Sequence, residues 1–166
     1  SIDFNYRNKL WQYDVKPSAI MGELTQYCDT LMGNIWALES LLDIPVDQSS
    51  INQQEYSKAS ESCINILRKK YSGVSTIAFT YRVENAKEPY YLATLYHEKA
   101  LIVSDKFKIK TILDKVGSGD AFMAALIYGI THHWQPKDII NKCVNVAINK
   151  LGEQGDHINT RIGDID

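Results

Sequence analysis

The most constraining feature of this 166-residue sequence is a small-residue loop placed directly before an apolar, helix-like run. The loop is Gly117-Ser118-Gly119, Asp120 follows it, and residues 121–130 are mostly apolar. Residues 108–113 lead into the loop and are rich in β-branched side chains, which predicts a strand. A strand, a glycine loop and a helix in this order indicate a protein of the α/β class.

The same junction predicts an anion site. Glycine adopts backbone angles that other residues avoid and lets another molecule approach the main chain closely. The first N–H groups of a helix lack partners inside the helix and carry partial positive charge, so phosphate is a natural ligand there. Gly, Ser and Asp are also ordinary capping residues, so the loop alone leaves a purely structural junction open. It is not a P-loop, because no G-x-x-x-x-G-K-[ST] segment occurs.

A longer motif carries a family resemblance. The segment Asp114-Lys-Val-Gly-Ser-Gly-Asp120, followed by Ala124-Ala-Leu126, resembles the second signature of the ribokinase-like (PfkB) sugar kinases, usually written D-T-x-G-A-G-D. Lys115 departs from that signature, where the family usually has Thr or another small residue. Residues 1–11 and 32–36 resemble the 2-keto-3-deoxygluconate kinase branch. The resemblance covers essentially the whole chain but only the C-terminal half or so of a family member, so we expect a C-terminal half without the N-terminal lid.

The resemblance implies a ribokinase-like three-layer α/β/α sandwich, with a mostly parallel sheet and helices on both faces. Residues 1–166 would be a single portion of the kinase domain, carrying the nucleotide site and the catalytic loop. Hydrophobic periodicity predicts a helix over 17–27, in which Ile20, Met21, Leu24 and Tyr27 form a helix-spaced apolar stripe. Further helices are predicted at 36–42, 55–71, 121–130 and 136–151, and strands at 1–5, 28–33, 75–82, 90–97 and 100–109.

The activity implied by the resemblance is ATP-dependent transfer of the γ-phosphoryl group to a hydroxyl of 2-keto-3-deoxygluconate or a related sugar acid. Asp120 would be the general base, orienting the hydroxyl before it becomes acidic in a loose transition state. The N–H groups of Gly117, Ser118 and Gly119 would stabilise the transferred phosphoryl oxygens. Mg²⁺ would bridge the ATP phosphates, Asp114 would shape the loop, and the family also implies a monovalent cation close to this region.

Four further residues are implied for the nucleotide. Where much of the family has T-x-G after a central strand, this chain has Thr80-Tyr81-Arg82, and Thr80 and Arg82 are the expected phosphate neighbours. The family lays adenine against the helix predicted at 136–151. Asn145 and Ala147 are therefore the expected residues of the adenine wall.

Asn5 and Arg7 are the expected substrate residues, and Asn34 is the expected indirect metal residue. Asn5 and Arg7 follow the first predicted strand, and ligands bind beyond the carboxyl ends of strands in open α/β sheets. The resemblance implies that Arg7, whose planar fork suits carboxylate or phosphate, holds the sugar carboxylate or the transferred group, with Asn5 assisting; a solvated loop is the alternative. Of the family's N-x-x-E pattern only Asn34 is retained, as an indirect metal residue, because Ala37 replaces Glu and Glu39 is turned away.

Composition removes several other function classes. Net charge is −2 without a basic block, so nucleic acid and anionic membranes are poor partner candidates. The sequence shows neither a run of transmembrane length nor a signal peptide, and its three cysteines are widely spaced, which predicts a cytoplasmic protein with reduced, buried thiols.

Two alternative functions stay open. One is a non-catalytic adenine-nucleotide-binding fragment, favoured by the altered T-x-G and N-x-x-E positions. The other is a kinase for a neutral sugar such as fructose or ribose, against which Arg7 argues. The sequence leaves open the sugar, the hydroxyl phosphorylated and the oligomeric state, although the resemblance implies a homodimer for the complete protein.

Overall fold

The computed structural model describes residues 1–164, which divide into two compact units. The first unit combines Ser1–Thr80 with Thr94–Leu101. The second combines Tyr81–Ala93 with the chain from Ile102 onward. Strands β3 (Thr76–Val83) and β4 (Tyr90–His97) each contribute residues to both units.

The first unit is built on parallel strands. Strands β1 (Ile2–Phe4), β2 (Thr30–Asn34) and the beginning of β3 pair in parallel, in the order β1-β2-β3. Most of their apolar side chains are buried, as expected for hydrophobic runs in parallel strands. The register sets Phe4 opposite Gly33, where a Cβ atom would lie 2.7 Å from that of Phe4. Glycine therefore allows these two strands to pair.

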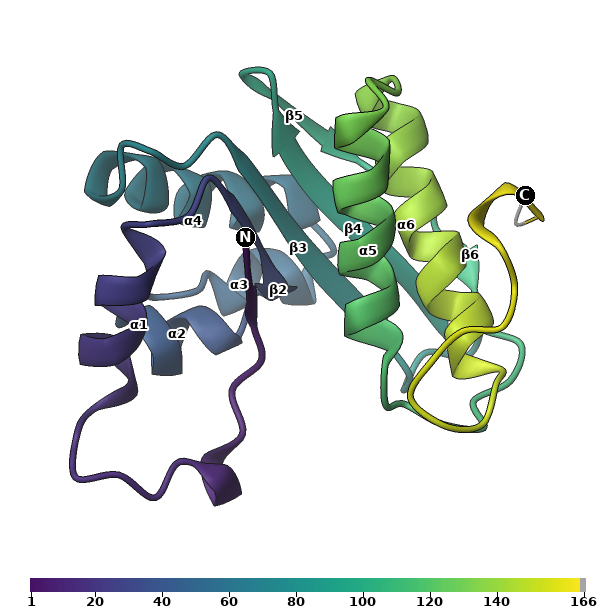
Figure 1. The fold of residues 1–166 in the computed structure, drawn as a ribbon, viewed down its shortest axis with the longest axis horizontal. Helices are drawn as coiled ribbons and strands as arrows, with labels where there is room; N and C mark the ends of the chain where they lie inside the picture. Colours follow the sequence, from purple (N-terminus) through teal and green to yellow (C-terminus); the bar gives the residue numbers. More distant parts are fainter. Residues whose placement is uncertain (165–166) are drawn as a thin grey trace. The chain divides into compact units, whose positions relative to one another are not determined.

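Four helices and a short 3₁₀ turn complete the first unit (Figure 1). They are α1 (Pro17–Thr25), α2 (Ala37–Leu42), α3 (Gln48–Asn52), α4 (Tyr56–Lys70) and η1 (Asn8–Leu10). Helix α4 is amphipathic: Ala59, Cys63 and Leu67 are buried, while its basic last turn complements the helix dipole. Helix α3 occupies part of the segment 45–54, where its first turn is capped by the Asp47 carboxylate, which accepts a bond of 3.0 Å from the Ser50 N–H.

The second unit contains the predicted glycine junction. Strand β5 (Ala100–Val103) ends in this unit, and β6 (Phe107–Lys108) pairs antiparallel with β4. Helices α5 (Ser118–Thr131) and α6 (Pro136–Leu151) run side by side; in Figure 1 α5 is green and α6 is yellow-green. At Gly129 an added Cβ would lie only 2.9 Å from Ile139, so glycine permits the close helix approach. A 3₁₀ turn, η2 (Ile162–Asp164), ends the described chain.

Two local predictions are wrong. Residues 109–113 are not a strand, because the N–H groups of Leu113 and Asp114 donate to the Leu151 carbonyl at the end of α6. The strand expected at 100–109 is likewise interrupted, since the N–H of Asp105 donates to the Asn141 side chain (2.9 Å) between β5 and β6. These N–H groups satisfy their hydrogen bonds outside the sheet.

The apolar stripe predicted for α1 is largely exposed. Ile20 and Leu24 are 41% and 48% exposed, and Tyr27, just beyond the helix, is 83% exposed. Helix α2 is the main packing partner of α1, and it does not cover this stripe.

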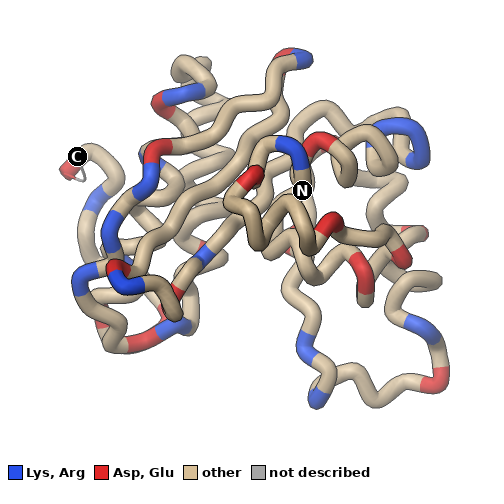
Figure 2. The backbone as a smooth tube through the Cα atoms, turned by 180° about the vertical axis from the view of Figure 1, so that it is seen from behind, with Lys and Arg blue, Asp and Glu red and all other residues tan. Residues whose placement is uncertain are grey.

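The cysteines are mostly buried, and charges of both signs are spread along the chain. Cys63 and Cys143 are buried free thiols, whereas Cys28 is partly exposed, so its predicted burial is only partial. Burial raises the pKa of the Cys63 thiol to about 11. Lys/Arg and Asp/Glu residues are interspersed along the backbone (Figure 2). In the described part of the chain, none of the helices is both long and apolar enough to span a bilayer.

Candidate functional site

The glycine junction forms a loop that only glycine can make. Residues 117–120, hereafter the anion loop, comprise Gly117 as the N-cap of α5 and the first three residues of that helix. Gly117 has φ = 79° and ψ = −7°, in the left-handed region that other residues avoid. A Cβ atom there would collide with the backbone carbonyl of Asp156. The N–H groups of the first turn of α5 lack partners inside the helix and are available to an anion.

The end of α6 supports the anion loop from both sides. The Ser118 hydroxyl donates to the Ala147 carbonyl (3.2 Å), in a fully buried contact. The Leu151 carbonyl accepts from the N–H of Leu113 (2.7 Å) and of Asp114 (3.3 Å). The last two turns of α6 therefore fix the segment that enters the loop and the first residue of α5.

Asp114 ties the loop to the segment after α6. Its Oδ1 accepts from the Val116 N–H (3.0 Å) and its Oδ2 from the Gly155 N–H (3.1 Å). These two backbone hydrogen bonds hold the pKa of the Asp114 carboxyl below its ordinary value, and attraction to Lys150 acts in the same direction. Asp114 thus shapes the loop, as the resemblance implied.

Asp120 is the free carboxylate of the loop. It lies in the first turn of α5 with an exposed side chain, and within residues 1–164 its carboxylate accepts no hydrogen bond. A carboxylate at a helix N-terminus is stabilised by the helix dipole and remains an acceptor for an incoming hydroxyl. Its geometry fits a general base or an orienting group for an alcohol.

Arg82 stands beside the segment that leads into the loop. Its Nε donates to Glu84 (2.8 Å), and the Lys115 ammonium contacts both oxygens of the same carboxylate at 2.8 and 2.7 Å. Lys115, followed by the attraction of Arg82, holds the pKa of Glu84 below its ordinary value. The residue that departs from the family signature is thus joined through Glu84 to Arg82. Thr80, two residues earlier on β3, is half-buried and pairs with Asn34.

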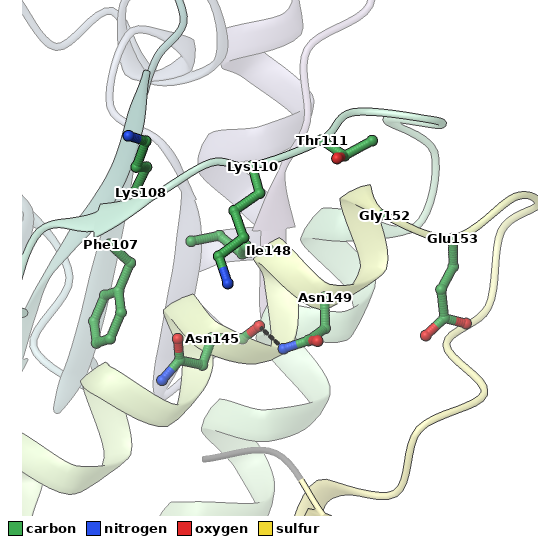
Figure 3. A pocket seen from close by; sticks show the side chains of 9 residues that line it. All are labelled: Phe107, Lys108, Lys110, Thr111, Asn145, Ile148, Asn149, Gly152 and Glu153. Carbon is green, nitrogen blue, oxygen red and sulfur yellow. Dashed lines mark hydrogen bonds between the residues drawn. The ribbon is translucent and has the colours of Figure 1, made fainter. Parts of the chain in front are cut away.

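A cavity of about 640 Å³ lies on the same end of α6 (Figure 3). This volume is within the usual range for a small-molecule site. One side is formed by Phe107, Lys108, Lys110 and Thr111. The other is formed by α6 and the residues directly after it: Asn145, Ile148, Asn149, Gly152 and Glu153. In Figure 3 the Lys110 side chain extends toward α6, where the Asn149 amide donates to the Asn145 carbonyl (2.9 Å).

The two residues predicted for the adenine wall are placed differently. Asn145 lines the cavity. Ala147 is fully buried, does not line the cavity, and presents its carbonyl to Ser118. The side chain that lines the cavity next to it is Ile148.

The first unit holds a smaller cavity of about 270 Å³ at the carboxyl ends of β1 and β2. Asn5 and Asn34 line it together with Trp36, Ala37 and Ser40. The predicted substrate residue and the predicted metal-side residue are therefore brought together. Arg7 is not in the lining; it is exposed and forms the N-cap of η1.

The metal-side residues are otherwise engaged in the protein. The Asn34 Oδ1 accepts from the Trp36 N–H (3.0 Å), and the Glu39 carboxylate accepts from the Val46 N–H (3.2 Å). Across residues 1–164 there is no group of three or more His, Cys, Asp or Glu side chains arranged to hold a metal ion.

Comparison with known proteins identifies the family of this chain. The family model for the pfkB family of carbohydrate kinases matches residues 2–161. The chain belongs to this family. Its structure superposes on that of a 2-dehydro-3-deoxygluconokinase from Thermotoga maritima with a TM-score of 0.82 and 26% identity, over 98% of this chain and 47% of the Thermotoga chain. No curated protein sequence is significantly similar to the chain.

Two further structures have the same fold. A protein from Enterococcus faecalis proposed to be a 2-keto-3-deoxygluconate kinase gives a TM-score of 0.79 at 23% identity, over 98% of this chain and 46% of its own. A PfkB family carbohydrate kinase from Listeria grayi gives 0.70 at 23% identity, over 93% and 44%. The predicted ribokinase-like, mostly parallel α/β fold is confirmed, and this PfkB chain spans about half the length of these relatives.

Sequence reasoning missed Glu84, Lys150 and Glu153. Glu84 joins Arg82 to Lys115, and Glu153 accepts hydrogen bonds from Asn159 and Thr160. Lys150 alone had a usable signal. It follows Cys143 by seven residues and Ala147 by three, so helical spacing places it on the buried stripe of α6.

Proposed function

We propose that this chain carries the nucleotide site and catalytic loop of an ATP-dependent kinase for 2-keto-3-deoxygluconate or a related sugar acid. One observation carries the proposal: the anion loop and the 640 Å³ cavity are both built on the last turns of α6. A nucleotide needs a pocket for its base and N–H groups for its phosphates; the cavity offers the pocket, and the anion loop held against α6 offers the N–H groups.

The nucleotide would use the cavity for its base. Phe107 and Ile148 supply apolar surface, while Asn145 and Lys110 supply polar groups that fix orientation. The phosphates would reach the N–H groups of the anion loop. Thr80 and Arg82 on β3 are the proposed phosphate neighbours, with Arg82 exchanging its contact with Glu84 for a phosphate oxygen.

The chemistry would rest on Asp120. Its exposed carboxylate would accept the hydrogen bond of the sugar hydroxyl, orient its attack and take its proton as the phosphoryl group transfers. The N–H groups of Gly117, Ser118 and Gly119 would stabilise charge on the transferred oxygens. Mg²⁺ bound with ATP would neutralise phosphate charge, held mainly by phosphate oxygens and water, with Asn34 at most indirect.

The acidic sugar is inferred from Arg7 and the relatives. Arg7 follows β1, is exposed, and carries a guanidinium suited to a carboxylate. Asn5 lines the neighbouring cavity at the end of the same strand. The Thermotoga maritima structure is that of a kinase for a sugar acid, which supports this substrate class.

A second function, nucleotide binding without catalysis, has its own supporting observation. Tyr81 is fully buried and Arg82 is paired with Glu84 where much of the family has T-x-G. The chain also spans only about half the length of its relatives.

Transfer of labelled phosphoryl from [γ-³²P]ATP separates these functions. The chain is assayed with 2-keto-3-deoxygluconate, and with fructose and ribose as neutral acceptors. The proposal expects label on the sugar acid, loss of transfer in Asp120→Asn, and normal transfer in Asp138→Asn, the matched first-turn carboxylate of α6. Mg-ADP binding without transfer to any acceptor would favour the second function, and transfer to neutral sugars alone would contradict the sugar-acid assignment.

A further inference from the structure

Lys150, in the last turn of α6, has a fully buried ammonium group. Its side chain is 0% exposed, and among residues 1–164 it is the only Lys, Arg, Asp or Glu that is buried. Lysine is almost never fully buried unless it is paired, because removing an ammonium from water is costly. A burial of this kind requires local compensation.

The compensation comes from the segment that supports the anion loop. The Lys150 Nζ donates to the Glu153 carbonyl oxygen (3.0 Å). Two carboxylates lie within its electrostatic reach: Asp114, which holds Gly155, and Glu153, which holds Asn159 and Thr160. Backbone hydrogen bonds are the main cause of the lowered pKa of both carboxyls, and Lys150 lowers them further.

The same segment touches the loop itself. The backbone of Asp156 lies against Gly117, so the path of residues 153–156 determines the space in which Gly117 must turn. Lys150 fixes the start of that path through Glu153, and Asp114 fixes its middle through Gly155. A displacement of this segment would release the contact that shapes the anion loop.

We propose that Lys150 is a positioning residue whose buried ammonium acts as a built-in cation. It organises Asp114 and the 153–156 segment so that the anion loop presents its N–H groups to a phosphate. The part concerning phosphate rests on the proposed function, whereas the part concerning loop structure does not.

The test compares Lys150→Met, a neutral side chain of similar length, with Lys150→Arg, which keeps the charge. Lys142→Met is the matched control on the same helix. Hydrogen exchange without ligand should accelerate in peptides covering 114–120 and 153–160 of Lys150→Met, and stay unchanged over 136–144. Mg-ADP affinity should fall about 10-fold, as expected for one charge-assisted hydrogen bond. Lys150→Arg should retain much of both properties.

A cavity variant separates charge from volume. In Lys150→Ala, n-propylammonium should restore the exchange protection of residues 153–160, whereas 1-propanol, similar in size but neutral, should not. Equal rescue by n-propylammonium and 1-propanol would overturn the role of the Lys150 charge. Wild-type hydrogen exchange together with wild-type Mg-ADP affinity in Lys150→Met would also overturn it. If the wild type fails to bind Mg-ADP, the proposed function fails, while the exchange data still decide the role of Lys150.

If the Lys150 variants do not fold, a measurement on the unaltered chain still tests the proposal. A ¹⁵N-labelled lysine spectrum should show one solvent-protected NH₃⁺ signal at neutral pH, absent from Lys150→Arg. Detection of Lys150 as a neutral amine, or as an ammonium exchanging as fast as the exposed lysines, would overturn the proposal.

Discussion

The α-carbon of Gly117 lies against the backbone carbonyl of Asp156, so closely that no side chain fits between them. These residues are 39 positions apart and belong to different segments of the second unit: one enters α5 and the other follows α6. The contact locks the anion loop to the segment after α6, and it can form only because residue 117 adopts φ = 79°.

Gly117→Ala should therefore damage both stability and anion binding. The new methyl group would collide with Asp156 and would hold alanine in the left-handed region, a destabilisation of about 1–3 kcal/mol. Urea unfolding measures it, and Gly163→Ala, where the Cβ would meet no atom within 4 Å, is the control. Wild-type stability together with wild-type Mg-ADP affinity in Gly117→Ala would refute this role.

Asp114 should make the second unit sensitive to acid. Its folded-state pKa lies below the ordinary 3.8, so its contribution to stability is present above pH 3.8 and disappears as pH falls through the folded pKa. The difference in urea midpoint between wild type and Asp114→Asn should be largest near neutral pH and shrink below 3.8. Asp138→Asn, which removes an exposed carboxylate, serves as the control. A difference in urea midpoint between wild type and Asp114→Asn that stays constant down to pH 2 would contradict the prediction.

The base pocket should respond to loss of its polar lining. Lys110→Met keeps the length of the side chain but removes its charge, and should weaken Mg-ADP binding about 3- to 10-fold, the size of one hydrogen bond. Isothermal titration gives the affinity, with Lys69→Met on α4 of the first unit as the control. Equal affinities for wild type and Lys110→Met would place the base elsewhere.

Arg7 should determine the preference for an acidic sugar. Arg7→Gln should raise the KM for 2-keto-3-deoxygluconate by about 10- to 100-fold, the loss expected when a carboxylate loses a charged partner, with the KM for ATP nearly unchanged. Initial rates against each substrate provide both values, and Lys9→Gln is the neighbouring control. A change confined to the KM for ATP would assign Arg7 to the phosphates.

Local signals in the sequence predicted much of the second unit. The helix predicted at 136–151 and the strand at 90–97 have the bounds found for α6 and β4, because Pro136 starts the helix and a run rich in aromatic residues marks the strand. The glycine junction was predicted since backbone freedom and helix capping are properties of a few adjacent residues.

The failures come from long-range competition. Residues 109–113 have β-branched composition, yet the α6 carbonyl at Leu151 takes the N–H groups that a strand would need. The apolar spacing in α1 correctly indicates a helix, but periodicity does not say whether a neighbouring element covers the apolar side chains. Lys150 lies on the buried stripe of α6. Helical spacing alone predicts its burial, but lysine is normally expected at the surface because of its charge.

The central claim is that the anion loop binds nucleotide phosphate, and amide NMR of the ¹⁵N-labelled chain tests it most directly. Mg-ADP should give saturable shifts of the Gly117, Ser118 and Gly119 amides, together with residues around Asn145. Adenosine, which lacks phosphates, should shift the Asn145 region and leave the loop amides in place. Loop amides that stay unmoved by saturating Mg-ADP, or that respond equally to adenosine, would contradict the claim.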